Sequence, residues 1–234
     1  MALLGIVGGS AFLEGGIPGG AARRSVRTRL GDVELHEGDG FVFVRRHGER
    51  YVPPHRVPHG AHALALASVG VGAAVGLCSV GALRPDLEPG TAVVPGDYLS
   101  LAPPPTLAEG DERLHIVPSL DAELRALLLE AAPAGGGPVE DGGVYAETRG
   151  PRFETRAEIR LLADYADVVG MTAAAEATVF QEAGLRYAVL GVVDNFAHGV
   201  GAEALTTERF EAQLAANRGR ARAILRAIIE RWEG

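Results

Sequence analysis

The chain has 234 residues, 47% of them hydrophobic and 22% charged, and is long enough to bury a substantial core. Its 22 basic and 30 acidic residues give a net charge of −8, which argues against a general binder of nucleic acid or of membrane surfaces. No apolar run approaches the roughly 18 residues of a membrane span. The single cysteine, Cys78, excludes an internal disulfide, so we expect a cytoplasmic protein.

Lysine is absent, and all 22 basic residues are arginine. Codon bias in a GC-rich genome explains this most simply, since alanine, glycine and proline are also abundant. The absence excludes Schiff-base chemistry, a pyridoxal anchor and a phosphate-binding loop that depends on lysine. A bound anion must therefore be held by arginine, histidine, hydroxyl groups or backbone N–H groups.

Apolar runs of strand length alternate with helical patterns along the chain. Several runs are continuously apolar, as expected for central strands covered on both faces. Strands are predicted at residues 3–7, 41–44, 73–80, 91–95, 143–148 and 187–193. Helices are predicted at residues 59–68, 119–132, 155–164, 173–183 and 206–232, the last with a threonine cap. This alternation predicts an α/β fold with a mixed central sheet flanked by helices.

Two Pro/Gly-rich segments, residues 101–112 and 132–143, interrupt this pattern. Strands and helices continue on both sides of each segment, so we interpret them as loops and not as domain boundaries. We therefore expect residues 1–234 to form a single domain.

The first predicted strand ends in two glycines and a serine, within the sequence GIVGGSAF. A dinucleotide fingerprint would need the spacing G-x-G-x-x-G at the start of a helix, and this segment lacks it. Backbone N–H groups and the hydroxyl of Ser10 can bind an anion at such a turn. A plain tight turn is the alternative.

Arg46 and His47 directly follow the second predicted strand. The guanidinium of arginine matches the paired oxygens of a phosphate, whereas a solvated strand end is the alternative for this pair. Ser79 lies among small residues at the end of a buried strand, where open α/β sheets bind ligands. The histidines near Arg46 lie among prolines and lack carboxylates at a zinc-like spacing, so we predict no metal site.

The segment from 147 to 176 carries further candidates. A Gly-Pro turn presents Phe153 and Glu154 before a helix, and Phe153 can stack on a flat base or belong to the core. Met171 and Thr172 precede a helix whose free N–H groups favour an anion. Glu176 is unusual within that apolar helix, so we expect it to be paired or to belong to a site.

Asp194 ends a strongly apolar strand in the sequence GVVDN. A carboxylate there is unfavourable without a partner or a function. It can cap a loop, or it can donate or orient a proton.

These segments, in this order, resemble the trimeric purine nucleoside phosphorylase superfamily, and most closely its 5'-methylthioadenosine phosphorylase branch. The resemblance spans nearly the full chain through GIVGGSAF, RRHG, LCSVGALRPDLEPG, GPRFETRAE, VVGMTAAAEA and GVVDN. It implies a homotrimer built on a twisted mixed sheet. It also implies a pentosyltransferase of purine salvage, which converts a purine nucleoside and phosphate to free base and pentose 1-phosphate. Inorganic phosphate is then a co-substrate, and no metal or organic cofactor is needed.

The resemblance also implies roles for individual residues. Phosphate binding falls to Ser10, Arg46, His47, Ser79 and Thr172. The nucleoside contacts are Phe153 on the base, Glu154, Met171 at the ribose, Asp194 near N7 of the purine, Phe196, and His115 donated to a neighbouring subunit. Asp194 is also the expected general acid, which would stabilise the departing base by roughly 10²–10⁴-fold in rate.

Two determinants of base preference point in opposite directions. Glu154 stands where 6-oxopurine enzymes carry glutamate, whereas the aspartate at position 194 favours adenine. Asn195 and Phe196 follow Asp194, where the methylthioadenosine branch usually has a second aspartate, and residues 57–62 lack an Asn-Tyr pair common in the family. We predict phosphorolysis most like that of 5'-methylthioadenosine. The alternatives are a 6-oxopurine phosphorylase acting on inosine, guanosine or methylthioinosine, a nucleosidase, and a catalytically weak nucleoside-binding protein.

Overall fold

Within the residues that the computed structural model describes (2–13, 15–17 and 20–232), eleven strands join into one mixed sheet. One part of the sheet has the strand order β2-β3-β4-β1-β5, and it continues through β10 and β9 to β7. β11 pairs with both β5 and β6, and β6 also pairs with β8. The strands are β1 Leu3–Gly8, β2 Ala22–Thr28, β3 Gly31–Glu37, β4 Phe41–Arg45, β5 Val71–Ala82, β6 Ala92–Val94, β7 Asp97–Ser100, β8 Val139–Asp141, β9 Val144–Glu147, β10 Val168–Gly170 and β11 Arg186–Phe196.

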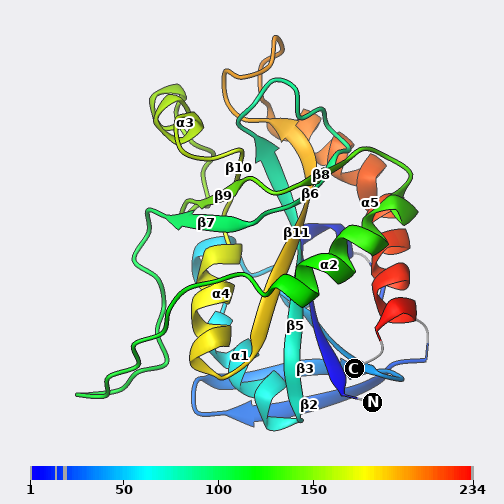
Figure 1. Ribbon diagram of the computed structural model, residues 1–234, viewed down its shortest axis with the longest axis vertical. Coiled ribbons are helices and arrows are strands. Elements are labelled where there is room, and N and C mark those ends of the chain that lie inside the picture. The colour runs from blue at the N-terminus through cyan, green and yellow to red at the C-terminus, as the bar shows by residue number, and fades with distance from the viewer. Residues whose placement is uncertain (1, 14, 18–19, 233–234) are drawn as a thin grey trace.

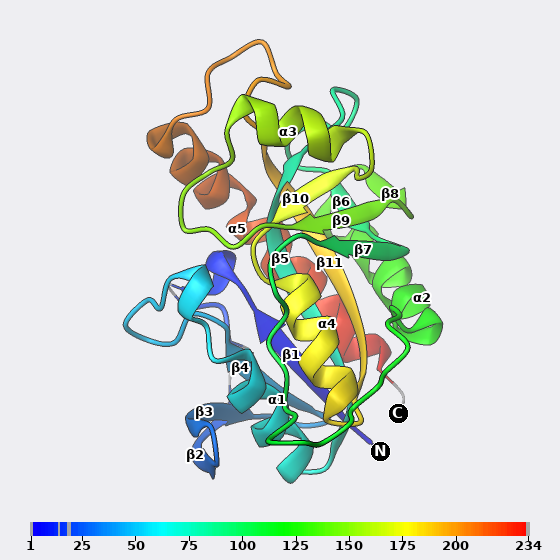
Figure 2. The ribbon, with the colours of Figure 1, turned by 90° about the vertical axis from the view of Figure 1, so that its left-hand side faces the viewer.

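Helices cover both faces of this sheet, as Figures 1 and 2 show. One apolar layer joins α1 and α4 to the sheet through residues such as Leu66 and Phe180. The opposite layer joins α2 and α5 through residues such as Leu128 and Ile224. The helices are α1 His59–Ser68, α2 Ala122–Ala131, α3 Arg156–Ala163, α4 Ala173–Glu182 and α5 Thr207–Arg231. The predicted single-domain α/β fold with a mixed central sheet is confirmed.

Helix ends follow the expected capping chemistry. The Thr206 side chain accepts a hydrogen bond from the backbone of Arg209 and begins α5, as the sequence predicts. Thr155 and Glu158 form a capping box at the start of α3. The helix predicted at residues 119–132 is shorter, because Asp121 caps it and the chain tightens into a 3₁₀ turn at Ala132–Gly135.

The β2–β3 hairpin and the short strands β7 and β8 were not predicted, and β8 lies within residues 132–143, which the sequence pattern indicated to be a loop. β2 is mostly exposed and carries three arginines, a serine and a threonine, so it lacks the apolar run on which the prediction depended. It is held at the edge of the sheet by pairing with β3 and by the ion pair between Arg24 and Glu37. Pairing with a neighbour, and not local hydrophobicity, defines these edge strands.

One edge of β5 is left open in the middle of the sheet. β1 pairs with β5 as far as Gly8 opposite Leu77, and β10 pairs on the same edge only from Gly81 onward. β11 pairs with β5 over residues 73–82 and therefore occupies the opposite edge. Among the described strands, none pairs with residues 78–80 of β5 on the first edge. The segments that follow β1 and β10 meet at this gap.

Candidate active site

A cavity of about 150 Å³ opens at the gap along β5. Segments that are far apart in the sequence converge on it, because β1, β4 and β10 all end nearby. Its wall includes eight of the predicted site residues: Ser10, Arg46, His47, Ser79, Phe153, Glu154, Met171 and Thr172. Asp194, Phe196 and His115 do not line it.

Arg46 is the central side chain at the inner end of the cavity. It is only 1% exposed, and it donates to the carboxylate of Glu176 from Nε at 2.5 Å and from Nη2 at 2.9 Å. Its other contacts run to the carbonyl oxygens of Val7 and Leu77. The expectation that Glu176 is paired is therefore confirmed. Ser10 and Thr172 add hydroxyl groups to the same cavity.

Gly9 makes room for this arginine. A Cβ atom added at Gly9 would overlap Nη1 of Arg46 and lie 2.7 Å from the carbonyl oxygen of Leu77. The Gly-Gly turn after β1 therefore leaves room for the guanidinium against the backbone.

His47 lies next to Arg46 in an uncharged form. Its Nδ1 lies 2.8 Å from the carbonyl oxygen of Val52, and its ring stacks on Tyr51 at a centroid distance of 5.4 Å. A carbonyl can only accept, so Nδ1 carries the proton. Burial and the positive charge of Arg46 lower the pKa of His47 to about 4. The neutral ring therefore has an unprotonated Nε2.

The N-terminus of α4 differs from the expectation that its N–H groups are free for an anion. The backbone N–H groups of Thr172 and Ala173 donate to the hydroxyl of Tyr145 at 3.3 and 3.4 Å. The N–H of Ala175 donates to the buried carboxylate of Glu147 at 2.9 Å. These backbone N–H groups already donate to protein side chains. The group at this helix end that can bind a ligand is therefore the side chain of Thr172.

Aromatic and polar side chains form the outer end of the cavity. Phe153 contacts Phe210 of α5 edge-to-face at 5.5 Å, and both line the cavity. Glu154 is 7% exposed and accepts a hydrogen bond of 2.5 Å from the hydroxyl of Thr148. Asn195 lies in the same wall, with its Nδ2 bonded to the carbonyl oxygen of Phe196.

Asp194 lies behind the cavity wall and not in it. Its carboxylate accepts a hydrogen bond of 2.7 Å from Nδ2 of Asn217 on α5, and the Ser79 hydroxyl donates to it as well. Burial raises the pKa of Asp194, and these two donors partly oppose the shift. The register of β11 against β5 shifts at this residue, from Val193 opposite Val80 to Asn195 opposite Gly81. Asn195 therefore lines the cavity in this structure and Asp194 does not, and the role of Asp194 at the base stays a prediction.

Two further predicted residues lie elsewhere. Phe196 is partly buried and packs against the α1/α4 core layer instead of lining the cavity. His115 is exposed on the long segment between β7 and α2. Its predicted contact with a neighbouring subunit stays a prediction.

Several cavity residues were not predicted, among them Tyr51, Asn195, Leu205 and Phe210. Strand alternation does not predict the side on which Asn195 lies, because the register shift at Asp194 interrupts it: Val193 and Phe196, three residues apart, both contact the α1/α4 core layer. Phe210 lies near the start of α5, and this position brings it to Phe153. No local pattern identifies Tyr51 or Leu205.

The described residues contain no group of three or more histidine, cysteine, aspartate or glutamate side chains arranged to hold a metal ion. They also contain no helix that is long and apolar enough to cross a membrane.

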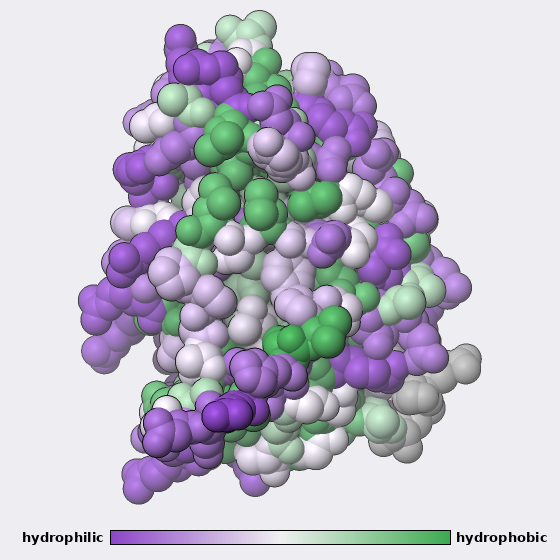
Figure 3. All heavy atoms as spheres, turned by 60° about the vertical axis from the view of Figure 1, so that its left-hand side comes forward, coloured by the Kyte–Doolittle hydropathy of each residue, from purple (hydrophilic) through white to green (hydrophobic). Residues whose placement is uncertain are grey.

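An apolar region lies on the face shown in Figure 3, bordered by hydrophilic side chains. Exposed large apolar residues include Leu101 and Leu161, which are 57% and 56% exposed and line a second cavity beside Glu154. Leu101 and Leu161 line one cavity together, and exposed apolar side chains that gather in this way can form an interaction site.

Comparisons with known proteins identify the class of protein to which this sheet and its arginine-centred cavity belong. Residues 7–230 match the family described as the Phosphorylase superfamily, and the chain belongs to that family. The fold matches methylthioadenosine phosphorylase from Schistosoma mansoni in complex with adenine, with a TM-score of 0.85 and 25% identity over 98% of this chain and 91% of that one.

Two relatives are named for different substrates. A probable 6-oxopurine nucleoside phosphorylase of Archaeoglobus fulgidus is 41% identical, covering 85% of this chain and 84% of the relative. An S-methyl-5'-thioadenosine phosphorylase of Pyrobaculum aerophilum is 32% identical, covering 89% of this chain and 79% of the relative. The chain thus resembles enzymes for both kinds of purine.

Proposed function

We propose that this protein catalyses the phosphorolysis of a purine nucleoside. The observation that carries the proposal is one cavity with two chemically different ends. Arg46, His47, Ser10 and Thr172 form one part of its wall, beside the ends of β1 and β4 and the start of α4, and Phe153 with polar partners forms another part, beside Phe210 of α5. The first set suits a phosphate and the second suits a flat, polar-edged base.

In this reaction the bond between C1' of the sugar and the purine nitrogen breaks, and the base takes the bonding electrons. The sugar becomes cationic in the transition state, and an oxygen of phosphate forms the new bond to C1'. Arg46 and the two hydroxyls hold the phosphate beside C1', which lowers the barrier by fixing the orientation of the reactants. Met171 lines the same cavity, next to Thr172 in the chain, and we assign it the contact with the sugar.

The base end favours a 6-oxopurine. An ionised Glu154 only accepts hydrogen bonds, so it matches the N1–H of hypoxanthine or guanine and opposes the unprotonated N1 of adenine. The amide of Asn195 donates to O6 or N7 and accepts in turn, which no aspartate can do when ionised. Asn195 takes the role at the base that the sequence suggested for Asp194, and it stabilises the departing anion by hydrogen bonding instead of by full protonation.

5'-Methylthioadenosine is the second candidate substrate. It is supported by the fold match to methylthioadenosine phosphorylase and by the Pyrobaculum aerophilum relative. Methylthioinosine combines a methylthio group with a 6-oxopurine base. It therefore agrees both with the polar side chains at the base end and with the similarity to methylthioadenosine phosphorylases.

The test is release of base from inosine, guanosine, methylthioinosine, adenosine and methylthioadenosine, each with and without phosphate. We expect phosphate-dependent release, greatest with a 6-oxopurine. Release that is undiminished without phosphate would make the protein a nucleosidase. Binding of nucleosides without turnover would make it a weak binding protein.

The assembly and setting are further parts of the proposal. The apolar surface around Leu101 and Leu161 suits burial against copies of this chain in a homotrimer. Sedimentation of the purified protein tests this. We propose that the enzyme acts in purine salvage in the cytoplasm, uses inorganic phosphate as its co-substrate, and needs no metal or organic cofactor. Activity retained after treatment with a chelator tests the last point.

A further inference from the structure

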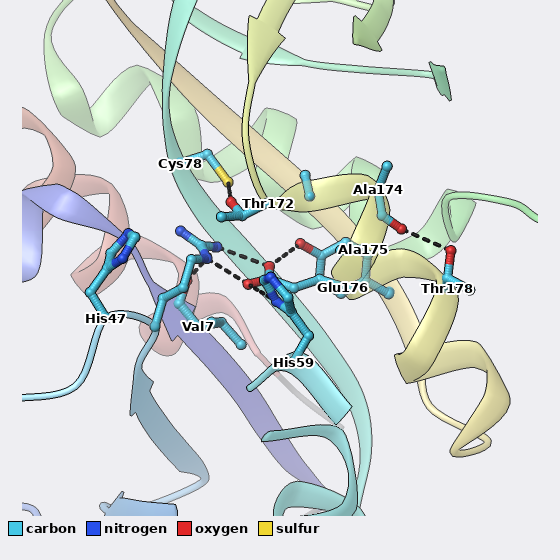
Figure 4. A network of polar contacts seen from close by, with 12 residues as sticks. Val7, His47, His59, Cys78, Thr172, Ala174, Ala175, Glu176 and Thr178 are labelled. Carbon is cyan, nitrogen blue, oxygen red and sulfur yellow. Dashed lines mark hydrogen bonds and ion pairs between the residues drawn. The ribbon is translucent and has the colours of Figure 1, made fainter. Parts of the chain in front are cut away.

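A buried carboxylate lies directly behind the proposed phosphate site. Glu176 on α4 is 0% exposed and does not line the cavity, yet both of its oxygens bond to Arg46, at 2.5 and 2.9 Å. Figure 4 shows Glu176 in this network, with His59 beside it and Thr172 on the adjoining segment. Glu176 cannot touch a ligand in the cavity, so any effect on the reaction passes through the arginine.

The donors of Arg46 are almost fully used. A guanidinium has five N–H groups. Nε and Nη2 donate to Glu176, Nη2 also donates to Val7, and Nη1 donates to Leu77 at 2.9 Å. These four bonds leave a single N–H, on Nη1, without a partner among the described residues. Since Arg46 lines the cavity, this is the donor available to a ligand.

Two neighbouring side chains also contact Glu176. The hydroxyl of Tyr187 donates to Oε2 of Glu176 at 2.6 Å, and Nδ1 of His59 lies 3.6 Å from Oε1. A Cβ atom at Gly76 would overlap the Tyr187 hydroxyl and lie 3.0 Å from Oε2. The ion pair therefore occupies space that two glycines leave free, Gly9 in the turn after β1 and Gly76 in the neighbouring strand β5.

Stability alone does not account for this arrangement. A buried ion pair contributes little net stability, because desolvation offsets the attraction between the charges. The pair does fix the plane and direction of the guanidinium, and orientation is what a phosphate needs from an arginine.

We infer that Glu176 is a positioning residue for phosphate: it holds Arg46 so that the free N–H on Nη1 points at the bound anion. The inference rests on the proposed phosphorolysis. It also has a consequence for charge, because Glu176 neutralises most of the positive charge of Arg46. Phosphate is then bound by directed hydrogen bonds more than by a net positive field.

Two substitutions separate positioning from charge compensation. Glu176→Asp keeps the charge but shortens the side chain by one methylene, and Glu176→Gln keeps the shape but removes the charge. Positioning predicts that both weaken the binding of inorganic phosphate by about tenfold or more, the loss expected for one charge-assisted hydrogen bond. The nucleoside KM should change by less than about threefold. Simple charge compensation predicts instead that Glu176→Asp is unaffected and Glu176→Gln binds phosphate more tightly, and either result would overturn the inference.

Phosphate binding is measured by calorimetry on the free protein, without nucleoside. If the wild-type protein neither binds phosphate nor releases base, the proposed function fails. If it does both and the folded variants bind phosphate within twofold of wild type, only the role of Glu176 fails.

Two further variants keep the test informative if a Glu176 variant does not fold. Tyr187→Phe removes one bond to Glu176 but keeps both bonds to Arg46, so a smaller loss of phosphate affinity, about two- to fivefold, is expected. Glu147→Gln is the matched control: it changes another buried carboxylate near the start of α4, one that bonds to Ala175 and not to Arg46. Equal losses in Glu147→Gln and the Glu176 variants would contradict a specific role for Glu176.

Discussion

The carboxylate of Asp194 is bonded to the amide of Asn217 at 2.7 Å, and this contact ties the end of β11 to α5. The next residue along the strand, Asn195, lines the cavity. Two adjacent polar residues therefore have separate roles: Asp194 binds Asn217 behind the cavity wall, and Asn195 forms part of that wall.

We expect Asp194→Ala to destabilise the protein by about 1–3 kcal/mol, because it removes the shorter of the two hydrogen bonds of the buried Asn217 amide and the acceptor of the Ser79 hydroxyl. Asn217→Ala should cause a similar loss, and chemical denaturation measures both. The contrary result is an Asp194→Asn variant with unchanged stability and abolished turnover, which would restore Asp194 as the general acid.

Asn195→Asp should shift the base preference. A carboxylate at this position accepts from the 6-amino group of adenine but repels O6 of hypoxanthine, so the ratio of kcat/KM for inosine to that for adenosine should fall by about tenfold or more. Parallel assays of base release measure the ratio. An unchanged ratio would mean that Asn195 does not contact the six-position of the base.

Ser10→Ala should weaken phosphate binding more than nucleoside binding. The hydroxyl lies at the anion end of the cavity, and loss of one neutral hydrogen bond corresponds to about two- to tenfold in affinity. The KM values for phosphate and nucleoside, determined separately, provide the comparison. Ser25→Ala, an exposed change on β2, is the control. Equal increases in both KM values would argue against Ser10 as a phosphate ligand.

Stability should fall as the pH drops below about 6.5. Burial, with a smaller effect from His59, lowers the pKa of His62 to about 3, and the pKa of His47 is about 4. In the unfolded chain each ionises near pH 6.5. Between these values the unfolded state binds more protons, so the free energy of unfolding rises with pH, by up to about 1.4 kcal/mol per pH unit for each histidine.

Urea denaturation between about pH 4.5 and 7 measures this slope. His62→Gln should reduce it, because the variant has one fewer buried histidine to protonate on unfolding. His55→Gln, which alters an exposed residue, should not. A His62→Gln slope equal to that of the wild-type protein would show that His62 is not held neutral in the folded state.

Much of the fold was predictable because long strands buried on both faces require continuous apolar runs. β1, β5 and β11 are such strands, and their predicted ranges fall within the observed ones. The cap at Thr206 is equally local. β2 and β7 were missed because exposed edge strands depend on pairing with a neighbour, for which a single segment carries no signal.

The sequence by itself determined which side chains were available: arginine as the only long cation, hydroxyls and glycines at strand ends, and the Phe-Glu and Asp-Asn pairs. Only the tertiary structure decided how they are used. The positions at which β1 and β10 end along β5 determine where the cavity opens. The hydrogen bond to Asn217 of α5 holds Asp194 outside the cavity. The pairing of Arg46 with Glu176, 130 positions away in the sequence, likewise depends on two strands and a helix meeting. Local patterns determine the face on which a side chain lies, but whether that face meets core or ligand depends on contacts between distant segments.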